Sequence, residues 1–366
     1  MMENAVRACV LNQSSHIHYY DHLSPMAALL EIPFLFVEED DMARNMRFYP
    51  GLKGEIVAFQ EFNPEYLLQH YDVVLMSDLW DRHVFREKFA PLEKEYGKTM
   101  RHVHVPHGFS DKVFYIRKMA NEDITFVYGD NMLDLLKSEG VYENLNQFII
   151  SGNYRYSYYK KHKEYLDQIA NEDALGGLDP NKKTILYAPT WMDLEQSTTF
   201  FDSCHHLLDN APSDYNILVK LHPRLELDDT VGFYEILGRY AKASNIFFVT
   251  DFPLIYPLLA RADIYIGDMS SIGYDFLAFD RPMFFLNKDR KDPKNDRRTF
   301  LFQCGTLIEE EDFANVYRII EKALPYDQER FSAIRKKIDR YTFGEERPFE
   351  EIRKDLFREC QTPPKK

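Results

Sequence analysis

The sequence has few cysteines, no long apolar run and no excess of basic charge. Its four cysteines lie far apart and form no CxxC pair, which favours reduced thiols in a cytoplasmic setting over disulfides or a structural zinc site. A formal net charge of −14 argues against nucleic acid as a partner. The apolar stretch nearest the N-terminus, 25–37, contains Glu31 and is too short to span a bilayer. We therefore expect neither a signal peptide nor a transmembrane helix, and any membrane contact to be peripheral.

Apolar residues make up 45% of the sequence and aromatic residues 15%, which is enough for packed cores. A chain of 366 residues is longer than one compact core usually holds, so we expect two domains of about 150 to 200 residues. Residues 1–170 are predicted to form the first domain and 184–340 the second. The segment 171–183, rich in Asp, Gly and Asn, is the expected linker. Residues 341–366 are expected to form a helix that packs back on the body of the protein.

Short strand-like segments alternate with helix-like segments in both halves. The strand patterns lie at 6–11, 32–37, 72–76, 102–105, 124–127, 147–150, 184–191, 216–221, 246–250, 264–266 and 283–286. A polar, aromatic helix is expected over 158–170. Such alternation predicts an α/β fold with parallel sheets covered by helices on both faces. Right-handed crossovers place all carboxyl ends of a sheet's strands on one edge, where open α/β sheets bind ligands.

Polar side chains gather where the strands of the second half end. This edge is predicted to carry Thr190, His222, Arg224, Asp251, Ser270 and Ser271. The planar guanidinium of Arg224 suits phosphate oxygens, and His222 can donate a hydrogen bond. The serines open a helix whose first N–H groups have no intrahelical partner. Together these groups favour a pyrophosphate site.

Each of these residues also has an ordinary structural explanation. Ser270 is a favoured N-cap in any helix. Arg224 is equally well explained by a surface ion pair, and His222 by a turn. Asp275, about one turn into the following helix, either accepts hydrogen bonds from ribose hydroxyls or occupies a solvated helix position.

His107 marks a second candidate site, in the first half. It follows the strand pattern at 101–105, which Pro106 ends. With a pKa near neutrality, a histidine here can take a proton from a hydroxyl. Gly108 permits close approach of the backbone, but a histidine before glycine is also common in an ordinary turn.

A loop near the N-terminus contains His16, His18, Asp21 and His22. These are residue types that bind metal ions, but their spacing matches no established site, so we expect no metal. The loop follows a predicted strand and is expected either to face a substrate cleft or to be an ordinary polar strand end. Near the other end of the chain, a stripe of Phe349, Ile352 and Leu356 is typical of a helix packed on the body of a protein. Its polar face is mixed in sign, which makes a membrane-surface role the weaker option.

Three segments of the second half resemble the CDP-glycerol glycerophosphotransferases of teichoic acid and capsule synthesis. They are ILYAPTW at 185–191, LVKLHPR at 218–224 and GDMSSIGYDFLAFDRPMFFL at 267–286. In the first half, His107-Gly108 followed by Lys112 is similar to that family's histidine-glycine element, and SGNYR at 151–155 to its turn before the linker. The resemblance covers roughly 101–308.

This resemblance implies a GT-B architecture, in which two Rossmann-like domains with parallel sheets face a central cleft and helices complete the C-terminus. It implies transfer of a polyol phosphate, glycerol phosphate first, from a CDP-activated donor to an acceptor hydroxyl with release of CMP. Neither a cofactor nor a metal is expected. The acceptor is expected to be a saccharide or lipid-linked, so the enzyme would be cytoplasmic and peripheral at the inner membrane face. Nothing in the sequence indicates an oligomeric state.

The resemblance also assigns residue roles. His107 would deprotonate the acceptor, and His222 would act at the pyrophosphate as the second catalytic residue. The donor would further be held by residues from both halves, namely Gly108, Thr190, Arg224, Asp268, Ser270, Ser271 and Asp275. The chain departs from the family pattern at Met269, where a tyrosine is usual, and at Met192, where an arginine often follows the tryptophan.

Two other functions share these features. A nucleotide-sugar glycosyltransferase or epimerase of the same architecture would use similar phosphate contacts. A nucleotide-binding protein without catalysis would keep the fold, although the presence of both His107 and His222 argues against it.

Overall fold

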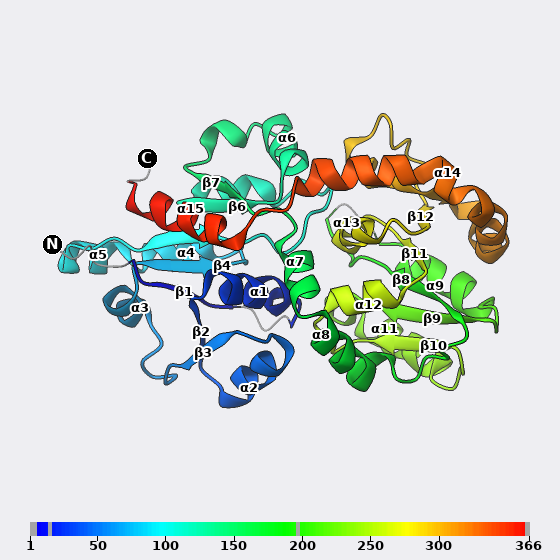
Figure 1. Ribbon diagram of the computed structural model, residues 1–366, viewed down its shortest axis with the longest axis horizontal. Coiled ribbons are helices and arrows are strands. Elements are labelled where there is room, and N and C mark those ends of the chain that lie inside the picture. The colour runs from blue at the N-terminus through cyan, green and yellow to red at the C-terminus, as the bar shows by residue number, and fades with distance from the viewer. Residues whose placement is uncertain (1–5, 14–16, 195–197, 363–366) are drawn as a thin grey trace. The chain divides into compact units, whose positions relative to one another are not determined.

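The computed structural model describes residues 6–13, 17–194 and 198–362 (Figure 1). The chain divides into two compact units. The first comprises Met1–Gly108, Val113–His162 and Thr342–Lys366, and the second comprises Phe109–Lys112 and Lys163–Tyr341. No helix within the described ranges is both long and apolar enough to cross a membrane.

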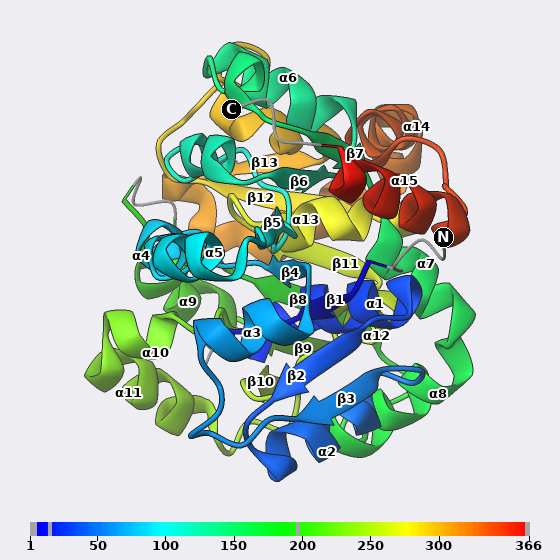
Figure 2. The same cartoon turned by 90° about the vertical axis from the view of Figure 1, so that its left-hand side faces the viewer.

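The first unit is built on a parallel sheet of seven strands in the order β3-β2-β1-β4-β5-β6-β7. The strands are β1 (Ala8–Val10), β2 (Pro33–Phe36), β3 (Lys53–Ile56), β4 (Val73–Met76), β5 (Arg101–His104), β6 (Ile124–Val127) and β7 (Phe148–Ile150). Figure 2 shows β2 and β3 side by side at one edge. The order reverses between β1 and β4, which is the position where doubly wound sheets bind ligands.

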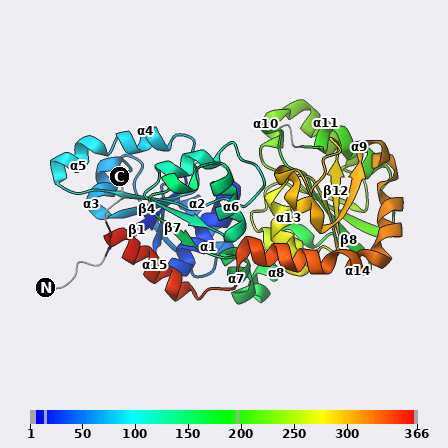
Figure 3. The same ribbon diagram turned by 90° about the horizontal axis from the view of Figure 1, so that it is seen from above.

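Helices cover both faces of this sheet. They are α1 (Tyr20–Leu30), α2 (Glu39–Phe48), α3 (Pro64–His70), α4 (Arg82–Glu87), α5 (Ala90–Tyr96), α6 (Asp130–Ser138), α7 (Tyr154–Lys161) and α15 (Phe349–Gln361). Figure 3 shows α4 and α5 on one side of the sheet and α1 and α15 on the other. Ile352 and Leu356 of α15 are buried, so its apolar stripe packs as the periodicity predicts. Arg347, just before α15, donates to the carbonyl oxygen of Ile150 at 2.6 Å.

The second unit has a parallel sheet of six strands in the order β10-β9-β8-β11-β12-β13. The strands are β8 (Lys183–Ala188), β9 (Tyr215–Lys220), β10 (Ile246–Val249), β11 (Ile264–Gly267), β12 (Met283–Asn287) and β13 (Thr306–Glu309). Their central residues are almost all apolar and buried, as expected for strands covered on both faces. In the register, the last residue of β11, Gly267, lies opposite the last residue of β8, Ala188. The polar segments that follow these two strands therefore start side by side.

The helices of the second unit include a long one near its end. They are α8 (Lys163–Ala170), α9 (Phe200–Asp209), α10 (Leu225–Asp228), α11 (Thr230–Tyr240), α12 (Ile255–Arg261), α13 (Ser271–Phe276) and α14 (Val316–Phe343). Side chains of α9, α11 and the first turns of α14 pack into one apolar core against alternate residues of the strands. The opposite residues of the strands face the other layer of helices.

The observed elements confirm the predicted alternation, but the strands β3 and β13 were not predicted, and some predicted segments differ in the structure. The helix expected over 158–170 is two helices, α7 and α8, which meet at His162, where the chain passes from the first unit to the second. The residues 171–175, expected in a linker, form a π-helix inside the second unit. The polar residues of 171–183 indicate a loop, but they do not mark the point where the chain changes units.

Candidate functional site

The polar residues at the ends of the second unit's strands include the pair His222 and Arg224. The backbone N–H of Arg224 donates to Nδ1 of His222 at 3.2 Å. Because Nδ1 accepts this bond, the neutral imidazole carries its proton on Nε2, which can donate. The Arg224 guanidinium carbon lies 4.0 Å from the centre of the Trp191 ring. The ring thus supports the cation on one side and leaves its N–H groups for an anion.

Ser270 and Ser271 open α13 next to these strand ends. Ser270 is the N-cap, and its side chain accepts from the backbone N–H of Ile272 at 3.4 Å. The N-cap explanation for Ser270 is therefore correct. The bond uses only the acceptor side of the hydroxyl, so its proton can still be donated. Ser271 is the first residue of the helix and is half-buried.

Asp268 holds the neighbouring loop. It is buried, and its carboxylate accepts from the backbone N–H of Thr190 at 2.8 Å and from the N–H and hydroxyl of Thr199 at 3.0 and 3.1 Å. Burial raises the pKa of Asp268 to about 6, and the hydrogen bonds oppose the increase. Its backbone carbonyl accepts from the Ser270 N–H at 2.8 Å. Asp268, expected among the donor-binding residues, therefore joins the Thr190 loop to the serine turn.

Thr190 and Asp275 are also buried. The Thr190 hydroxyl accepts from Nζ of Lys112 at 2.7 Å, and Asp275 accepts from the Tyr256 hydroxyl of α12 at 2.9 Å. Asp275 is thus not the solvated helix residue that was one of its two explanations. The Tyr256 hydroxyl thus gives this buried carboxylate a hydrogen-bond donor, and contact of Asp275 with ribose stays a prediction.

Met269 lies in this turn and is buried. Beside it is a cavity of about 20 Å³, which Thr199, Lys288 and Thr299 help to line. This volume holds about one water molecule. The departure from the family pattern at this position places a thioether between Asp268 and Ser270 instead of a polar ring.

His107 lies in the first unit, three residues after the last residue of β5. Gly108 adopts a φ of +104°, a conformation that favours glycine. Its N–H donates to the Tyr128 hydroxyl at 3.0 Å, and that hydroxyl donates to the carbonyl oxygen of Pro106 at 3.0 Å. This pair of bonds fixes the turn on both sides of His107.

The segment expected as a loop near the N-terminus is helical over its described part, because residues 17–19 form a 3-10 helix and Asp21 and His22 lie in the first turn of α1. Three of its rings lie near His107. The centroid distances from His107 are 4.8 Å to Tyr19, 6.1 Å to His18 and 6.5 Å to His22. Burial, helped by the nearby charge of Arg155, holds the pKa of His22 well below its usual value, so His22 is neutral. Residues of this segment and His107, the predicted base, therefore lie close together within the first unit.

Asp21 of this segment has a structural partner. Asp21 pairs with Arg155, and within the described ranges no three His, Cys, Asp or Glu residues are placed to hold an ion. His16 lies outside the described residues. The acidic member of the loop thus orients α1 against α7.

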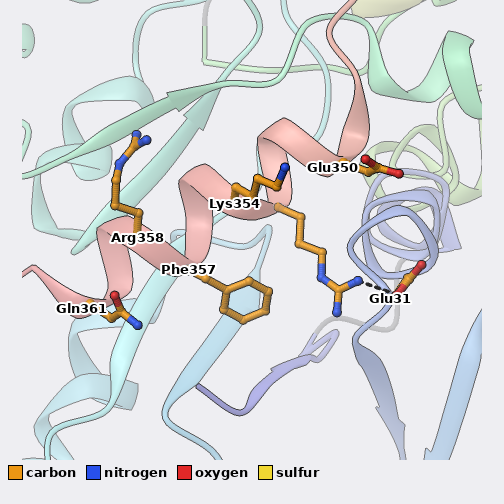
Figure 4. Close-up of a pocket in the computed structure, with 7 residues that line it drawn as sticks. Glu31, Glu350, Lys354, Phe357, Arg358 and Gln361 are labelled. Atoms are coloured by element: carbon orange, nitrogen blue, oxygen red, sulfur yellow. Dashed lines mark hydrogen bonds and ion pairs between the residues drawn. The ribbon is translucent and has the colours of Figure 1, made fainter. Parts of the chain in front are cut away.

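An open pocket of about 570 Å³ lies elsewhere in the first unit, between the end of α1 and α15. Figure 4 shows Lys354, Phe357 and Arg358 along α15 and an ion pair from Arg353 to Glu31. The lining carries charges of both signs. None of the predicted site residues takes part in it.

Residues 116–347 match the family described as CDP-Glycerol:Poly(glycerophosphate) glycerophosphotransferase, which is more than half of the chain. The chain belongs to this family. The match begins after His107 and Gly108 and includes all the strands of the second unit. This is the glycerophosphotransferase family that the motifs of the second half indicated.

Individual relatives agree with the family. The teichoic acid glycerol-phosphate primase of Bacillus subtilis (strain 168) is 29% identical over 135 residues, which are 37% of this chain and 31% of that protein. The chain thus spans less than a third of the length of this relative. A structure of the wall teichoic acid polymerase TagF soaked with CDPG has a TM-score of 0.64 and 14% identity, over 97% of this chain and 88% of that one.

The fold is shared more widely than the family. The UDP-GlcNAc 2-epimerase from Methanocaldococcus jannaschii has a TM-score of 0.57 and 14% identity, over 95% of this chain and 98% of that one. At such identities the likeness shows the fold alone. It confirms the predicted α/β class with two parallel sheets of the GT-B type.

Sequence reasoning missed two parts of this arrangement. The Trp191 ring under Arg224 was expected only as part of a motif, and Asp111 was not singled out. Asp111 contacts Tyr274 and Arg297, which are 163 and 186 residues away in the chain. No local pattern indicates such a pairing. The nearest signal is the run of Ser, Asp and Lys after Gly108, because charged residues next to a buried strand need partners.

Proposed function

We propose that this chain transfers glycerol phosphate from CDP-glycerol to an acceptor hydroxyl and releases CMP, in the synthesis of a teichoic-acid-like or capsular polymer. The observation that carries the proposal is the geometry of His222 and Arg224. One offers an Nε2–H donor and the other a ring-supported guanidinium, at the end of a strand in a chain of the glycerophosphotransferase family.

The reaction makes one P–O bond and breaks another. The acceptor oxygen attacks the phosphorus that carries the glycerol, and the bond from that phosphorus to the bridging oxygen breaks. CMP leaves with the bridging oxygen and its electron pair, and the acceptor proton passes to His107. The products are a phosphodiester and CMP.

Negative charge grows on the CMP phosphate as this bond breaks. His222, Arg224 and the hydroxyls of Ser270 and Ser271 are positively charged or hydrogen-bond donors, so they stabilise this charge in the transition state. Asp275 is assigned to the ribose hydroxyls. The acceptor is a saccharide or a lipid-linked molecule, and we place the protein in the cytoplasm at the inner membrane face.

The donor is tested by measuring CMP release from CDP-glycerol and CDP-ribitol with a lipid-linked saccharide as acceptor. In parallel, UDP release and epimerisation are measured with UDP-GlcNAc. The proposal expects CMP and a phosphodiester from CDP-glycerol. An epimerised sugar from UDP-GlcNAc would instead support the epimerase alternative, which the fold shared with UDP-GlcNAc 2-epimerase keeps open. Binding of CDP-glycerol without CMP release, across several acceptors, would support a protein without catalysis.

A further inference from the structure

The four residues Phe109–Lys112 belong to the second unit, although the chain on both sides of them belongs to the first. All four are buried. The Phe109 ring meets the Tyr274 ring edge to face, with centroids 4.8 Å apart. Two of the four residues are charged, and buried charges require partners. These partners belong to the segments that form the proposed donor site.

Asp111 is bound to α13 and to the segment after β12. Its carboxylate accepts from the Tyr274 hydroxyl at 2.6 Å and from the backbone N–H of Leu301 at 3.1 Å, and it pairs with the guanidinium of Arg297. Tyr274 lies in α13, the helix that Ser270 and Ser271 open. Asp111 thus holds this helix at Tyr274, three residues after Ser271.

Lys112 is bound to the segment after β8. Its Nζ donates to the Thr190 hydroxyl at 2.7 Å and pairs with Asp193 at 2.6 Å. It also lies 5.8 Å from the centre of the Trp191 ring, which supports Arg224. The ammonium group therefore fixes the orientation of the Thr190 hydroxyl and of the loop that presents Trp191.

We propose that Asp111 and Lys112 are positioning residues of the donor site. Asp111 acts through Tyr274 on α13, and Lys112 acts through Thr190 on the Trp191 loop. They follow His107 by four and five residues in the chain, so the segment that orders the donor site is covalently attached to the base. This inference rests on the proposed function, because it takes the same residues as the donor site.

The first test replaces Tyr274 with Phe, which keeps the ring against Phe109 and removes only the hydroxyl. The dissociation constant of CDP is measured by calorimetry, together with KM and kcat for CDP-glycerol. We expect CDP binding to weaken about 5- to 100-fold with a matching rise in KM. The matched control is Tyr317→Phe, whose hydroxyl donates to the Leu207 carbonyl in the same unit. The control should leave CDP binding within about twofold of the unmodified protein.

The second test is a double-mutant cycle of Lys112→Met and Thr190→Val. If Lys112 acts through Thr190, the Lys112 substitution should weaken CDP binding in the unmodified protein but add little in the Thr190→Val protein. Thr190→Ser, which keeps the hydroxyl, should bind CDP almost normally. Independent, multiplicative effects of the two substitutions would contradict this assignment. If Lys112→Met fails to fold because Asp193 loses its partner, Lys112→Met with Asp193→Asn replaces it in the cycle.

The outcomes separate this inference from the proposed function. If the unmodified protein binds CDP and releases CMP while folded Tyr274→Phe and Lys112→Met bind CDP within about twofold of it, the positioning role is wrong and the function stands. If the unmodified protein neither binds CDP nor releases CMP, the proposed function fails, and this inference fails with it.

Discussion

At the scale of single residues, His222 is fixed by its own neighbour in the chain. The Arg224 N–H occupies Nδ1, so Nε2 is left as the donor. A preorganised donor aimed at developing charge contributes to the rate far more than to ground-state binding. His222→Ala should therefore lower kcat for CMP release by roughly 100- to 1,000-fold, with a smaller change in CDP affinity. An unchanged kcat would remove His222 from the site.

A second prediction at this scale concerns the role of Trp191 in donor binding. Its ring lies 4.0 Å from the Arg224 guanidinium carbon, and cation–π contacts of this kind contribute about 1 to 2 kcal/mol. Trp191→Ala should raise KM for the donor about 5- to 30-fold, because Arg224 loses its support. Trp191→Phe should recover part of the loss. Steady-state kinetics on both variants distinguish this role from one in core packing. An equal KM for Trp191→Ala and Trp191→Phe would contradict a role of the ring in supporting Arg224.

The candidate residues at strand ends could be predicted because their location in the sheet follows from their position in the sequence. A parallel sheet puts the residue after each strand on one edge, and Arg, His and Ser at such positions suit phosphate. The partners of these residues could not be predicted. Asp268 is a plain acidic residue in the sequence, and only the fold shows that its oxygens are used by Thr190 and Thr199.

At the scale of elements, a buried hydrogen bond links α12 to α13. The Tyr256 hydroxyl donates to Asp275 at 2.9 Å. Removing a donor to a buried carboxylate costs about 1 to 3 kcal/mol, so Tyr256→Phe should lower the free energy of unfolding by that amount and raise KM for the donor. Urea denaturation measures the first and steady-state kinetics the second. A loss of stability with an unchanged KM would show that Asp275 does not take part in donor binding.

Asp268 connects three segments and gives a pH prediction. Because burial raises its pKa to about 6, the folded protein keeps a proton that the unfolded chain releases between about pH 4 and 6. The contribution of this group to the free energy of unfolding therefore falls as pH rises through this window. Asn does not titrate, so the stability of the unmodified protein relative to Asp268→Asn should decrease from pH 4 to 6 and then level off.

Urea denaturation of both proteins at pH 4, 5, 6 and 7 checks this prediction. Only the difference between the two proteins is informative, since other carboxyls, the half-buried Asp339 among them, also have raised pKa values. A difference that does not vary with pH would mean that Asp268 has an ordinary pKa.

Most elements could be predicted from periodicity, and the exceptions have physical reasons. The strand β3 has the sequence KGEI, which is short, polar and partly exposed at an edge of its sheet, so it lacks the apolar pattern of a covered strand. The predicted helix over 158–170 has no glycine or proline at its break. The helix divides at His162 because the residues before this point pack in the first unit and those after it pack in the second.

At the scale of the whole molecule, the chain passes between its two units at four points, at 108/109, 112/113, 162/163 and 341/342. Sequence composition indicates two cores but not these passages. The composition of Phe109–Lys112 does not show that these four residues belong to the second unit, because that assignment depends on contacts with residues far away in the chain. The family motifs were recognisable because they lie within single strand-turn-helix segments.

The central claim is the proposal that His107 acts as the base in transfer from a CDP-activated donor. It is tested most directly by measuring CMP release and CDP binding for the unmodified protein and for His107→Ala, with CDP-glycerol and a lipid-linked saccharide acceptor. The account predicts that His107→Ala loses CMP release by at least about 100-fold, as expected for loss of a general base, while CDP binds with nearly unchanged affinity. Full CMP release by His107→Ala would contradict it.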